Sequence, residues 1–343
     1  MQNSNLLAEI ACRFPDAQHL GCSTSGEIFQ TDVYDESLVI TAIEFKHTPI
    51  NTVSACIRDF SSAHELGVSL AQQLPHQELR YVFALCDGQL INGSALVAGV
   101  SAILPEHVGV SGGLAGDADR FEKTVVWKNQ QLDVGQAVLC GFYGKHLHIG
   151  HGSLGGWSAF GPEREITRSE NNILFELDGQ PALDLYKRYL GKFSEQLPAS
   201  ALRFPLSLKM PGELETVVRT ILSVNEQDHS MIFAGDVPMG ATAKLMKASF
   251  DAIIDGAHGS AEFATMDLQG SSPEFAILIS CVGRRLVLGQ RAFEELEAVS
   301  NVLGSSCIHS GFYSYGEISP LMESAQCRLH NQTMTITTFK EDE

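Results

Sequence analysis

The stretch GFYSYGEI, Gly311 to Ile318, has a counterpart in GCSTSGEI, Gly21 to Ile28, near the other end of the chain. Each begins with glycine, continues through small, hydroxylated or aromatic residues, and ends in Gly-Glu-Ile. Before the second copy, the apolar run 274–282 predicts a strand, and apolar residues recur at helical spacing in 290–304. A strand, a loop at 283–289, a helix and a glycine-ended strand are therefore expected in succession. The segment 326–339 (QCRLHNQTMTITTF) is expected as a hairpin with His-Asn at its turn.

The same order of elements is predicted twice more. Residues 81–88 (YVFALCDG) indicate a strand, 91–105 a helix of small residues, and 108–117 (VGVSGGLAGD) a strand that runs into glycines. The N-terminal copy has a helix, the first Gly-Glu-Ile element and a strand at 37–45 (SLVITAIEF), but no strand before Leu6, which suggests a truncated or misassigned start. The repeat predicts an α/β fold with two related lobes of mixed β-sheets, flanked by helices and facing each other.

The length of 343 residues favours two lobes. We expect residues 1–200 and 201–343, with the boundary somewhere between about 150 and 205. The proline-containing segment 197–206 (LPASALRFPL) is the best linker candidate.

Charge and cysteine content exclude several functions. With 23 basic and 41 acidic residues, the net charge of −18 disfavours nucleic acid and anionic membrane surfaces. The eight cysteines form no C-x-x-C pair, as is typical of reduced thiols in the cytoplasm. No signal peptide and no apolar run of about 20 residues is present, so we predict a cytoplasmic protein without a membrane span.

Several motifs resemble the FIST family, in order from about residue 20 to 340. They are GCSTSGEI, LCDG, GVSGGLAGD, ELDGQPALDLYKRYLG, CVGRR, GFYSYGEISP and LHNQTMTIT. The resemblance implies a FIST-N-like lobe followed by a FIST-C-like lobe. It also implies a signalling input domain that senses small molecules such as amino acids. The chain departs from the family in lacking the strand that usually precedes the first helix.

Some stand-alone members of that family are haemoproteins that sense nitric oxide. The resemblance therefore implies haem b as cofactor, a gas ligand, and a histidine kinase or a cyclic-di-GMP enzyme as partner, since the chain has no output module of its own. A homodimer is left open. The alternative is a haem-free sensor of an amino acid or a similar zwitterion.

A haem sensor needs an axial imidazole or thiolate. His151, between glycines at the expected end of a strand, is the first candidate for this metal ligand, and Cys281 is the second. The arginines after Cys281 are expected to lower its thiol pKa. The alternatives are a histidine that bonds its own turn and a buried, inert cysteine.

Other residues suit a ligand with a carboxylate or an ammonium group. Arg284 or Arg285 could bind a carboxylate, or could instead pair with Glu294 or Glu295 as scaffold. Alternation places Tyr313 and Tyr315 on one face of a strand, where they could wall a pocket. The remaining candidates at strand ends are Ser23, Thr24, Glu27, Asp87, Gly112, Gly113 and Glu317.

No motif indicates an enzyme. GVSGG, residues 109–113, resembles G-x-S-x-G, but the expected elements around it lack the strand–turn–helix of a nucleophile elbow. The glycine-rich segments lack the Lys-Ser/Thr of a phosphate-binding loop, and H-E-x-x-H is missing. We therefore expect a binding protein, and an enzyme of unrecognised type is the least favoured reading.

Overall fold

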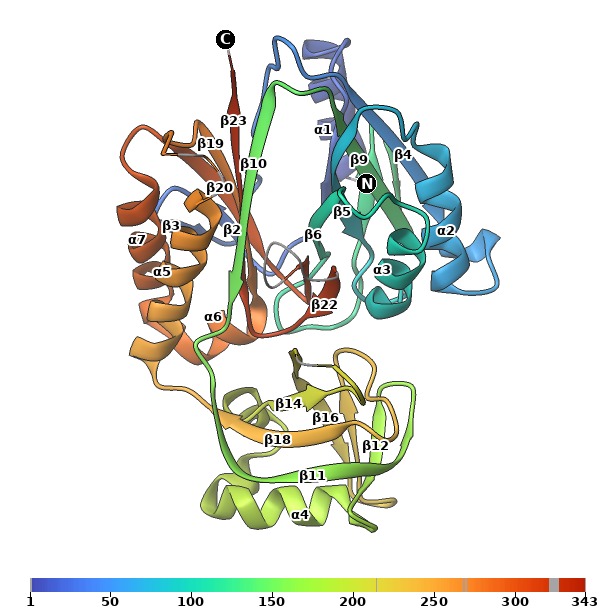
Figure 1. Cartoon of the computed structure of the whole chain (residues 1–343), viewed down its shortest axis with the longest axis vertical. Helices are drawn as coiled ribbons and strands as arrows, with labels where there is room; N and C mark the ends of the chain where they lie inside the picture. The colour runs from blue at the N-terminus through green and yellow to red at the C-terminus, as the bar shows by residue number, and fades with distance from the viewer. Residues whose placement is uncertain (1, 214, 267, 269, 321–326, 343) are drawn as a thin grey trace.

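The computed structural model describes residues 2–213, 215–266, 268, 270–320 and 327–342. Two six-stranded sheets stand face to face above a smaller domain (Figure 1). The first sheet has the order β22-β21-β6-β5-β9-β4 and the second the order β10-β23-β19-β20-β2-β3.

The strands of the first sheet are β4 (Ile50–Cys56), β5 (Leu79–Cys86), β6 (Gly109–Leu114), β9 (Gln136–Tyr143), β21 (Glu317–Ser319) and β22 (Arg328–His330). Those of the second are β2 (Glu27–Phe29), β3 (Asp32–Tyr34), β10 (Leu147–Leu154), β19 (Phe275–Cys281), β20 (Ile308–Ser314) and β23 (Met334–Glu341). A three-stranded sheet comprises β1 (Leu20–Cys22), β7 (Val126–Lys128) and β8 (Gln131–Asp133).

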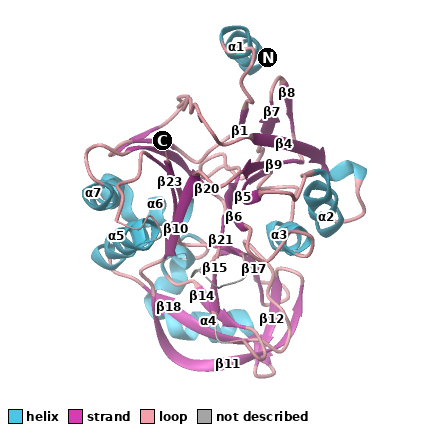
Figure 2. Cartoon of the chain, turned by 45° about the horizontal axis from the view of Figure 1, so that its top comes forward, coloured by secondary structure: helices cyan, strands magenta, loops and turns pink. Residues whose placement is uncertain are grey.

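Helices cover the outer faces of both large sheets (Figures 1 and 2). They are α2 (Ala63–Gln73) and α3 (Gly93–Ser101) on the first sheet, and α5 (Phe250–Met266) and α7 (Ala292–Leu303) on the second. The helix α6 (Val282–Leu288) follows β19 directly, and α1 (Gln2–Arg13) projects from the body in Figure 2. The part of the chain that the structure describes holds no helix long and apolar enough to cross a membrane.

Local sequence explains where α2 and α3 begin and how closely they pack. Ser62 caps α2 by accepting a hydrogen bond from Glu65 N, and Asn92 caps α3 in the same way. A Cβ atom on Gly99 would lie 2.1 Å from the carbonyl oxygen of His64, so only glycine allows this helix contact.

The two large sheets repeat one another, as the sequence predicts. Strands β6-β5-β9-β4 correspond in order and direction to β20-β19-β23-β10, and each set has one parallel pair, β5 with β6 and β19 with β20. The two Gly-Glu-Ile strands are exchanged between sheets: β2 pairs with β20, and β21 pairs with β6. The lobes are therefore intertwined rather than consecutive in sequence.

The inner faces of the sheets meet in an apolar layer. Its buried side chains include Phe83 and Phe142 from the first sheet and Ile279, Phe312 and Phe339 from the second. This layer is a single core that neither sheet forms alone, so the fold depends on both halves of the repeat.

Residues 158–247 form a separate small domain at the bottom of Figure 1. Its sheet has the order β15-β14-β18-β11-β12-β17-β16, with β13 beside β12. The strands are β11 (Ser158–Glu170), β12 (Ile173–Leu177), β13 (Gln180–Pro181), β14 (Leu206–Lys209), β15 (Thr216–Arg219), β16 (Ile221–Asn225), β17 (Ser230–Phe233) and β18 (Thr242–Lys247). The helix α4 (Ala182–Leu190) covers one face of this sheet. The small domain has its own apolar core, separate from those of the large sheets.

Three expected elements differ in the structure. Residues 37–45, expected as a strand, form none, and their apolar side chains Leu38, Ile40 and Ile43 are exposed. Residues 283–288, expected as part of a loop at 283–289, belong to helix α6. Strands β22 and β23, expected as a hairpin, belong to different sheets, so the turn between them crosses from one sheet to the other.

Candidate functional site

The turn between β22 and β23, residues 331–333, lies where both sheets, α6 and the small domain meet, and we call it the junction turn. Gln332 has a φ of +64°, which is unfavourable for a residue with a side chain. Its carbonyl oxygen accepts hydrogen bonds from Trp157 Nε1 at 3.0 Å and from Arg284 Nη1 at 3.4 Å. Its Nε2 donates to the carbonyl oxygen of Leu202 in the small domain at 3.3 Å.

Two glycines allow this packing. A Cβ atom on Gly283 would lie 2.6 Å from Gln332 Nε2, and one on Gly155 would lie 3.0 Å from the carbonyl oxygen of Gln332. Gly283 of the CVGRR motif and Gly155 after β10 thus let α6 and the end of β10 approach the junction turn.

The small domain contacts the junction turn through buried polar groups. Arg219 Nη1 donates to the carbonyl oxygen of Leu329 at 2.9 Å, and its Nε donates to that of Asp236 at 3.0 Å. Burial lowers the pKa of Arg219 to about 10, which still leaves it charged at neutral pH. Thr220 N donates to Asn331 Oδ1 at 3.5 Å, next to Gln332.

Two buried polar atoms at this junction lack a hydrogen-bond partner among the described residues. They are Gln332 Oε1 and Thr220 Oγ1, and their residues are 0% and 4% exposed. Buried side-chain polar atoms are nearly always bonded, and each one left unsatisfied costs about 1–3 kcal/mol. Gln332 Oε1 and Thr220 Oγ1 are therefore the two polar atoms at this junction that a further hydrogen-bond partner would satisfy.

Arg284 forms a buried scaffold beside the junction turn. Its Nε and Nη2 donate to Glu295 Oε2 at 3.0 and 2.8 Å, and its other contacts are the carbonyl oxygens of Gly155 at 2.6 Å and Ile253 at 2.7 Å. Glu295 also accepts hydrogen bonds from Ser280 and Tyr313. The guanidinium of Arg284 is thus fully bonded within the protein, which agrees with the alternative that it pairs with a glutamate as scaffold instead of binding a ligand.

Glu317, in the second Gly-Glu-Ile element, is fully buried above the junction turn. It accepts hydrogen bonds from Ser314 Oγ at 2.6 Å and from Thr333 Oγ1 at 3.0 Å. Burial raises its pKa to about 8, although these donors act in the opposite direction. Glu317 is therefore mostly protonated at neutral pH.

Cys281 differs from its predicted state. Burial raises the pKa of its thiol, and the neighbouring Glu317 raises it further. Arg284 lowers the pKa only slightly by comparison, because Glu295 balances its charge. The expected thiolate is therefore disfavoured.

The first Gly-Glu-Ile element lies in a more open place. Thr24 Oγ1 donates to Glu27 Oε1 at 2.9 Å, and Ser23 Oγ accepts from Val125 N. Arg285 donates to Asp35 Oδ1 at 2.8 Å and to the carbonyl oxygen of Ser25 at 2.5 Å. These residues fasten the N-terminal segment to α6 and to the chain before β7, and they are not part of the junction.

The first-lobe candidates also have structural partners. Asp87 accepts hydrogen bonds from the backbone N–H groups of Gln89, Leu90 and Gly135 and from the Thr124 hydroxyl. A Cβ atom on Gly112 would lie 1.9 Å from the carbonyl oxygen of Ala84, and one on Gly113 would lie 2.8 Å from Ile279 Cγ2. These three residues build the end of the first sheet.

Tyr313 and Tyr315 do not share a face, contrary to the prediction. Tyr313 packs with the helices outside the second sheet, whereas Tyr315 packs in the core of the first. The chain leaves β20 at Ser314 and crosses to the first sheet, which breaks the alternation. Tyr315 donates to Asp117 and stacks on Phe121 with ring centroids 4.6 Å apart.

His151 lies in the middle of β10 rather than at its end, opposite Thr337 of β23. Cβ atoms on Gly150 and Gly152 would lie 2.1 and 2.0 Å from carbonyl oxygens of α5, so the helix closes that face of the strand. Alternation places the imidazole on the opposite face, toward the first sheet, where Thr337 bonds Ser111 at 2.7 Å.

The described residues include no group of three or more His, Cys, Asp or Glu side chains placed to hold a metal ion. Sequence reasoning missed Thr220, Trp157 and Gln332. The His-Asn turn signal drew attention to residues 330–331, but nothing in the segment RTIL marks Thr220 as functional.

Two facing sheets flanked by helices and joined to a small domain through a buried polar junction define an α/β protein with two related lobes. The FIST N domain model matches residues 2–180, and the FIST C domain model matches residues 182–320. The chain therefore belongs to the FIST family, whose domains are small-ligand sensory domains in signal transduction. No curated protein matches the chain.

Proposed function

We propose that this chain is a sensor that binds a small zwitterion, such as a free amino acid, at the junction turn. The observation that carries the proposal is the pair of buried, unpartnered atoms, Gln332 Oε1 and Thr220 Oγ1, among the described residues. An ammonium group can donate to the amide oxygen, and a carboxylate can accept from the hydroxyl. A polar ligand would relieve the cost of both groups.

Two short connections join the small domain to the sheets, at residues 155–157 and 248–249. Binding at the junction turn would stabilise one orientation of the small domain over others. A partner that contacts both the small domain and the large sheets, such as a histidine kinase or a cyclic-di-GMP enzyme, would respond to this change of orientation. Such partners come from the family resemblance and remain a proposal, as do a cytoplasmic location and a homodimer.

The test is a thermal-shift screen with the twenty amino acids, followed by calorimetric titration of the best one. A ligand at about 100 times its Kd adds about 2.7 kcal/mol to stability. Thr220→Val and Gln332→Met should weaken binding by about tenfold each, because each removes one polar contact. Thr52→Val is the matched control, since Thr52 is a buried threonine bonded to Gln18 far from the junction. Full-strength binding to both junction variants would refute the proposed site.

The haem and nitric oxide proposal is separate and rests on the family resemblance. Cys281 fits an axial thiolate poorly, because burial raises its pKa. His151 fits better, since its face of β10 adjoins the apolar layer between the sheets. When bound, haem would supply an iron centre for the gas, and His151 would hold that iron.

Titration with haemin tests this version directly. A saturable Soret band that shifts with nitric oxide and is lost in His151→Ala would support it, with His148→Ala as the control on the same strand. A non-saturating spectrum with folded protein would contradict it.

A further inference from the structure

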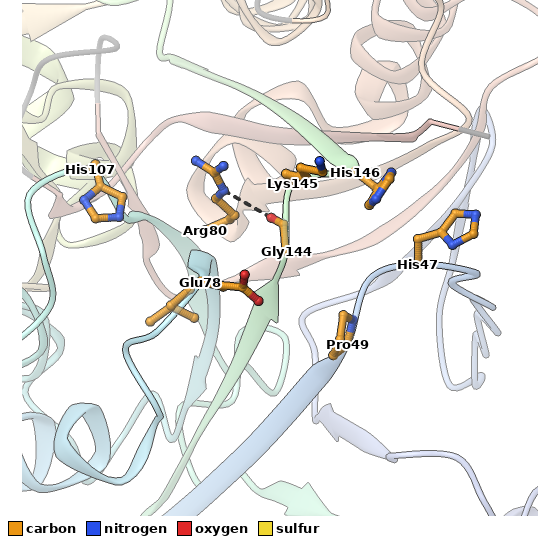
Figure 3. Close-up of a pocket in the computed structure, with 9 residues that line it drawn as sticks. His47, Pro49, Glu78, Arg80, His107, Gly144, Lys145 and His146 are labelled. Atoms are coloured by element: carbon orange, nitrogen blue, oxygen red, sulfur yellow. Dashed lines mark hydrogen bonds between the residues drawn. The ribbon is translucent and has the colours of Figure 1, made fainter.

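A groove of about 430 Å³ lies at the opposite end of β10 from the junction turn. It is bounded by the turn between β9 and β10, the beginning of β4 and the beginning of β5. Figure 3 shows Gly144 at its centre, between the side chains of Arg80, Lys145, His146 and Glu78. His107 and His47 lie at its two sides.

The groove collects positive charge on an acidic protein. The chain carries a net charge of −18 with its histidines counted as neutral, yet on the same count the lining has two cations, Arg80 and Lys145, against one carboxylate, that of Glu78. Three histidines add ring nitrogens to the lining. A concave surface of one sign concentrates ions of the opposite sign. The groove therefore favours anions that the rest of the surface repels.

The two permanent cations have no carboxylate partner among the described residues. Arg80 Nε donates to the carbonyl oxygen of Gly144 at 3.1 Å, and this bond leaves both Nη atoms directed away from Gly144 in Figure 3. No described ion pair includes Arg80 or Lys145, whereas most other arginines on the surface are paired.

Two acidic residues, Glu341 at the end of β23 and the following Asp342, lie beside the groove. Glu341 accepts hydrogen bonds from Lys46 N at 2.7 Å, His47 N at 3.0 Å and Thr48 Oγ1 at 2.6 Å. Asp342 bonds His148 Nε2 at 2.8 Å. Both carboxylates also interact electrostatically with groove histidines, Glu341 with His47 and Asp342 with His146. Neither carboxylate forms a described ion pair with Arg80 or Lys145, so these two cations are the positive groups left for an anion.

We infer that this groove binds a small phosphate-bearing molecule, whose phosphate is held by Arg80 and Lys145. The free Nη atoms offer a fork that matches two phosphate oxygens, and the lysine adds a point charge. The rings of His47 and His146, 5.0 Å apart, add further N–H donors. The volume suits a ligand of nucleotide size. This site is independent of the junction turn and of the sensor proposal.

Calorimetric titration at low salt with inorganic phosphate, AMP and citrate tests the inference. We expect saturable binding of one AMP per chain, tighter than phosphate, and binding weakened about tenfold or more in Arg80→Gln/Lys145→Gln. The double variant Arg120→Gln/Lys192→Gln removes the same charge from exposed, unpaired positions and should bind like wild type.

Lys145→Gln alone guards against a folding defect, since Lys145 is exposed and bonds no described residue. No saturable binding of AMP or phosphate to the wild type would overturn the inference. So would equal loss in both double variants, which indicates a general charge effect, or binding of citrate without AMP.

Discussion

The neighbourhoods of the two Gly-Glu-Ile strands share a sequence pattern but differ in chemistry. Around β2, Glu27 is half-buried and bonds hydroxyls, and Arg285 pairs with the exposed Asp35. Around β21, Glu317 is fully buried with a raised pKa, and the adjacent Arg284 pairs with the buried Glu295. The surroundings of each strand in its sheet, rather than the motif, decide whether the neighbouring charged side chains are solvated or are paired with buried groups of the protein.

The neighbouring arginines give the largest test of this difference. Arg284→Met should destabilise the protein by about 3–5 kcal/mol, because it leaves Glu295 buried without a counter-charge. Arg285→Met should cost about 1–2 kcal/mol, since water replaces the pair with Asp35, which is 63% exposed, and the main loss is the hydrogen bond to the carbonyl oxygen of Ser25. Urea unfolding midpoints measure the stability of both variants. Equal losses of stability would contradict the difference between a buried and an exposed ion pair.

The pH dependence of stability tests the burial of Glu317. Its folded pKa of about 8 lies above its unfolded value, so the unfolded chain releases this proton first as pH rises. Stability due to this group is therefore intact below about pH 4.5 and falls by about 1.4 kcal/mol per unit up to about pH 8.

Glu317→Gln should remove this fall, so its stability relative to wild type should increase between pH 5 and 8. Thr333→Val is the matched control, because it removes one hydrogen bond but retains the titrating carboxyl. Parallel profiles for wild type and Glu317→Gln would show that the carboxyl is solvated.

Alanine substitution of the motif glycines should cost more stability in the first motif than in the second, the opposite of the order expected for the arginines. Gly26 has a φ of +126°, and a Cβ atom there would lie 2.2 Å from Arg285 Nη1, so Gly26→Ala should cost about 1–3 kcal/mol. A Cβ atom on Gly316 would lie 2.9 Å from the tip of Leu329, and its next contacts, Asn331 Nδ2 and the carbonyl oxygen of His330, are at an ordinary 3.5 Å. Gly316→Ala should therefore cost about 1 kcal/mol. Thermal unfolding of both variants checks the order.

The smallest expected quantity is the coupling energy between the two tyrosines. Tyr313→Phe and Tyr315→Phe each remove a hydroxyl that donates to a carboxylate, at a cost of about 1–2 kcal/mol. Because the rings lie in the cores of different sheets, the double variant should show the sum within about 0.5 kcal/mol. A larger coupling energy would indicate that the two rings share one pocket and would contradict their separation.

The sequence predicted the repeat and the α/β fold because apolar periodicity and glycine exits are local signals. It did not predict the exchange of β2 and β21, since strand pairing depends on contacts between distant segments. The same exchange separates Tyr313 from Tyr315. The prediction of a lowered pKa for the Cys281 thiol was wrong, because burial raises this pKa more than the nearby arginine lowers it. A single sequence does not display burial.

Of the candidate site, the sequence correctly anticipated the Arg284–Glu295 pair as one of two alternatives. Thr220 and Gln332 were missed, because their importance arises only where the small domain meets the junction turn. SLVITAIEF has strand-like alternation, yet its backbone pairs with no strand in the described part of the chain.

Hydrogen–deuterium exchange with and without the amino acid that gives the largest thermal shift tests the central claim most directly. The account predicts slower exchange in two separate segments, residues 216–221 and 330–334, because the ligand bridges the small domain and the junction turn. Protection confined to the groove segment 144–147, or absent from both junction segments, would contradict it.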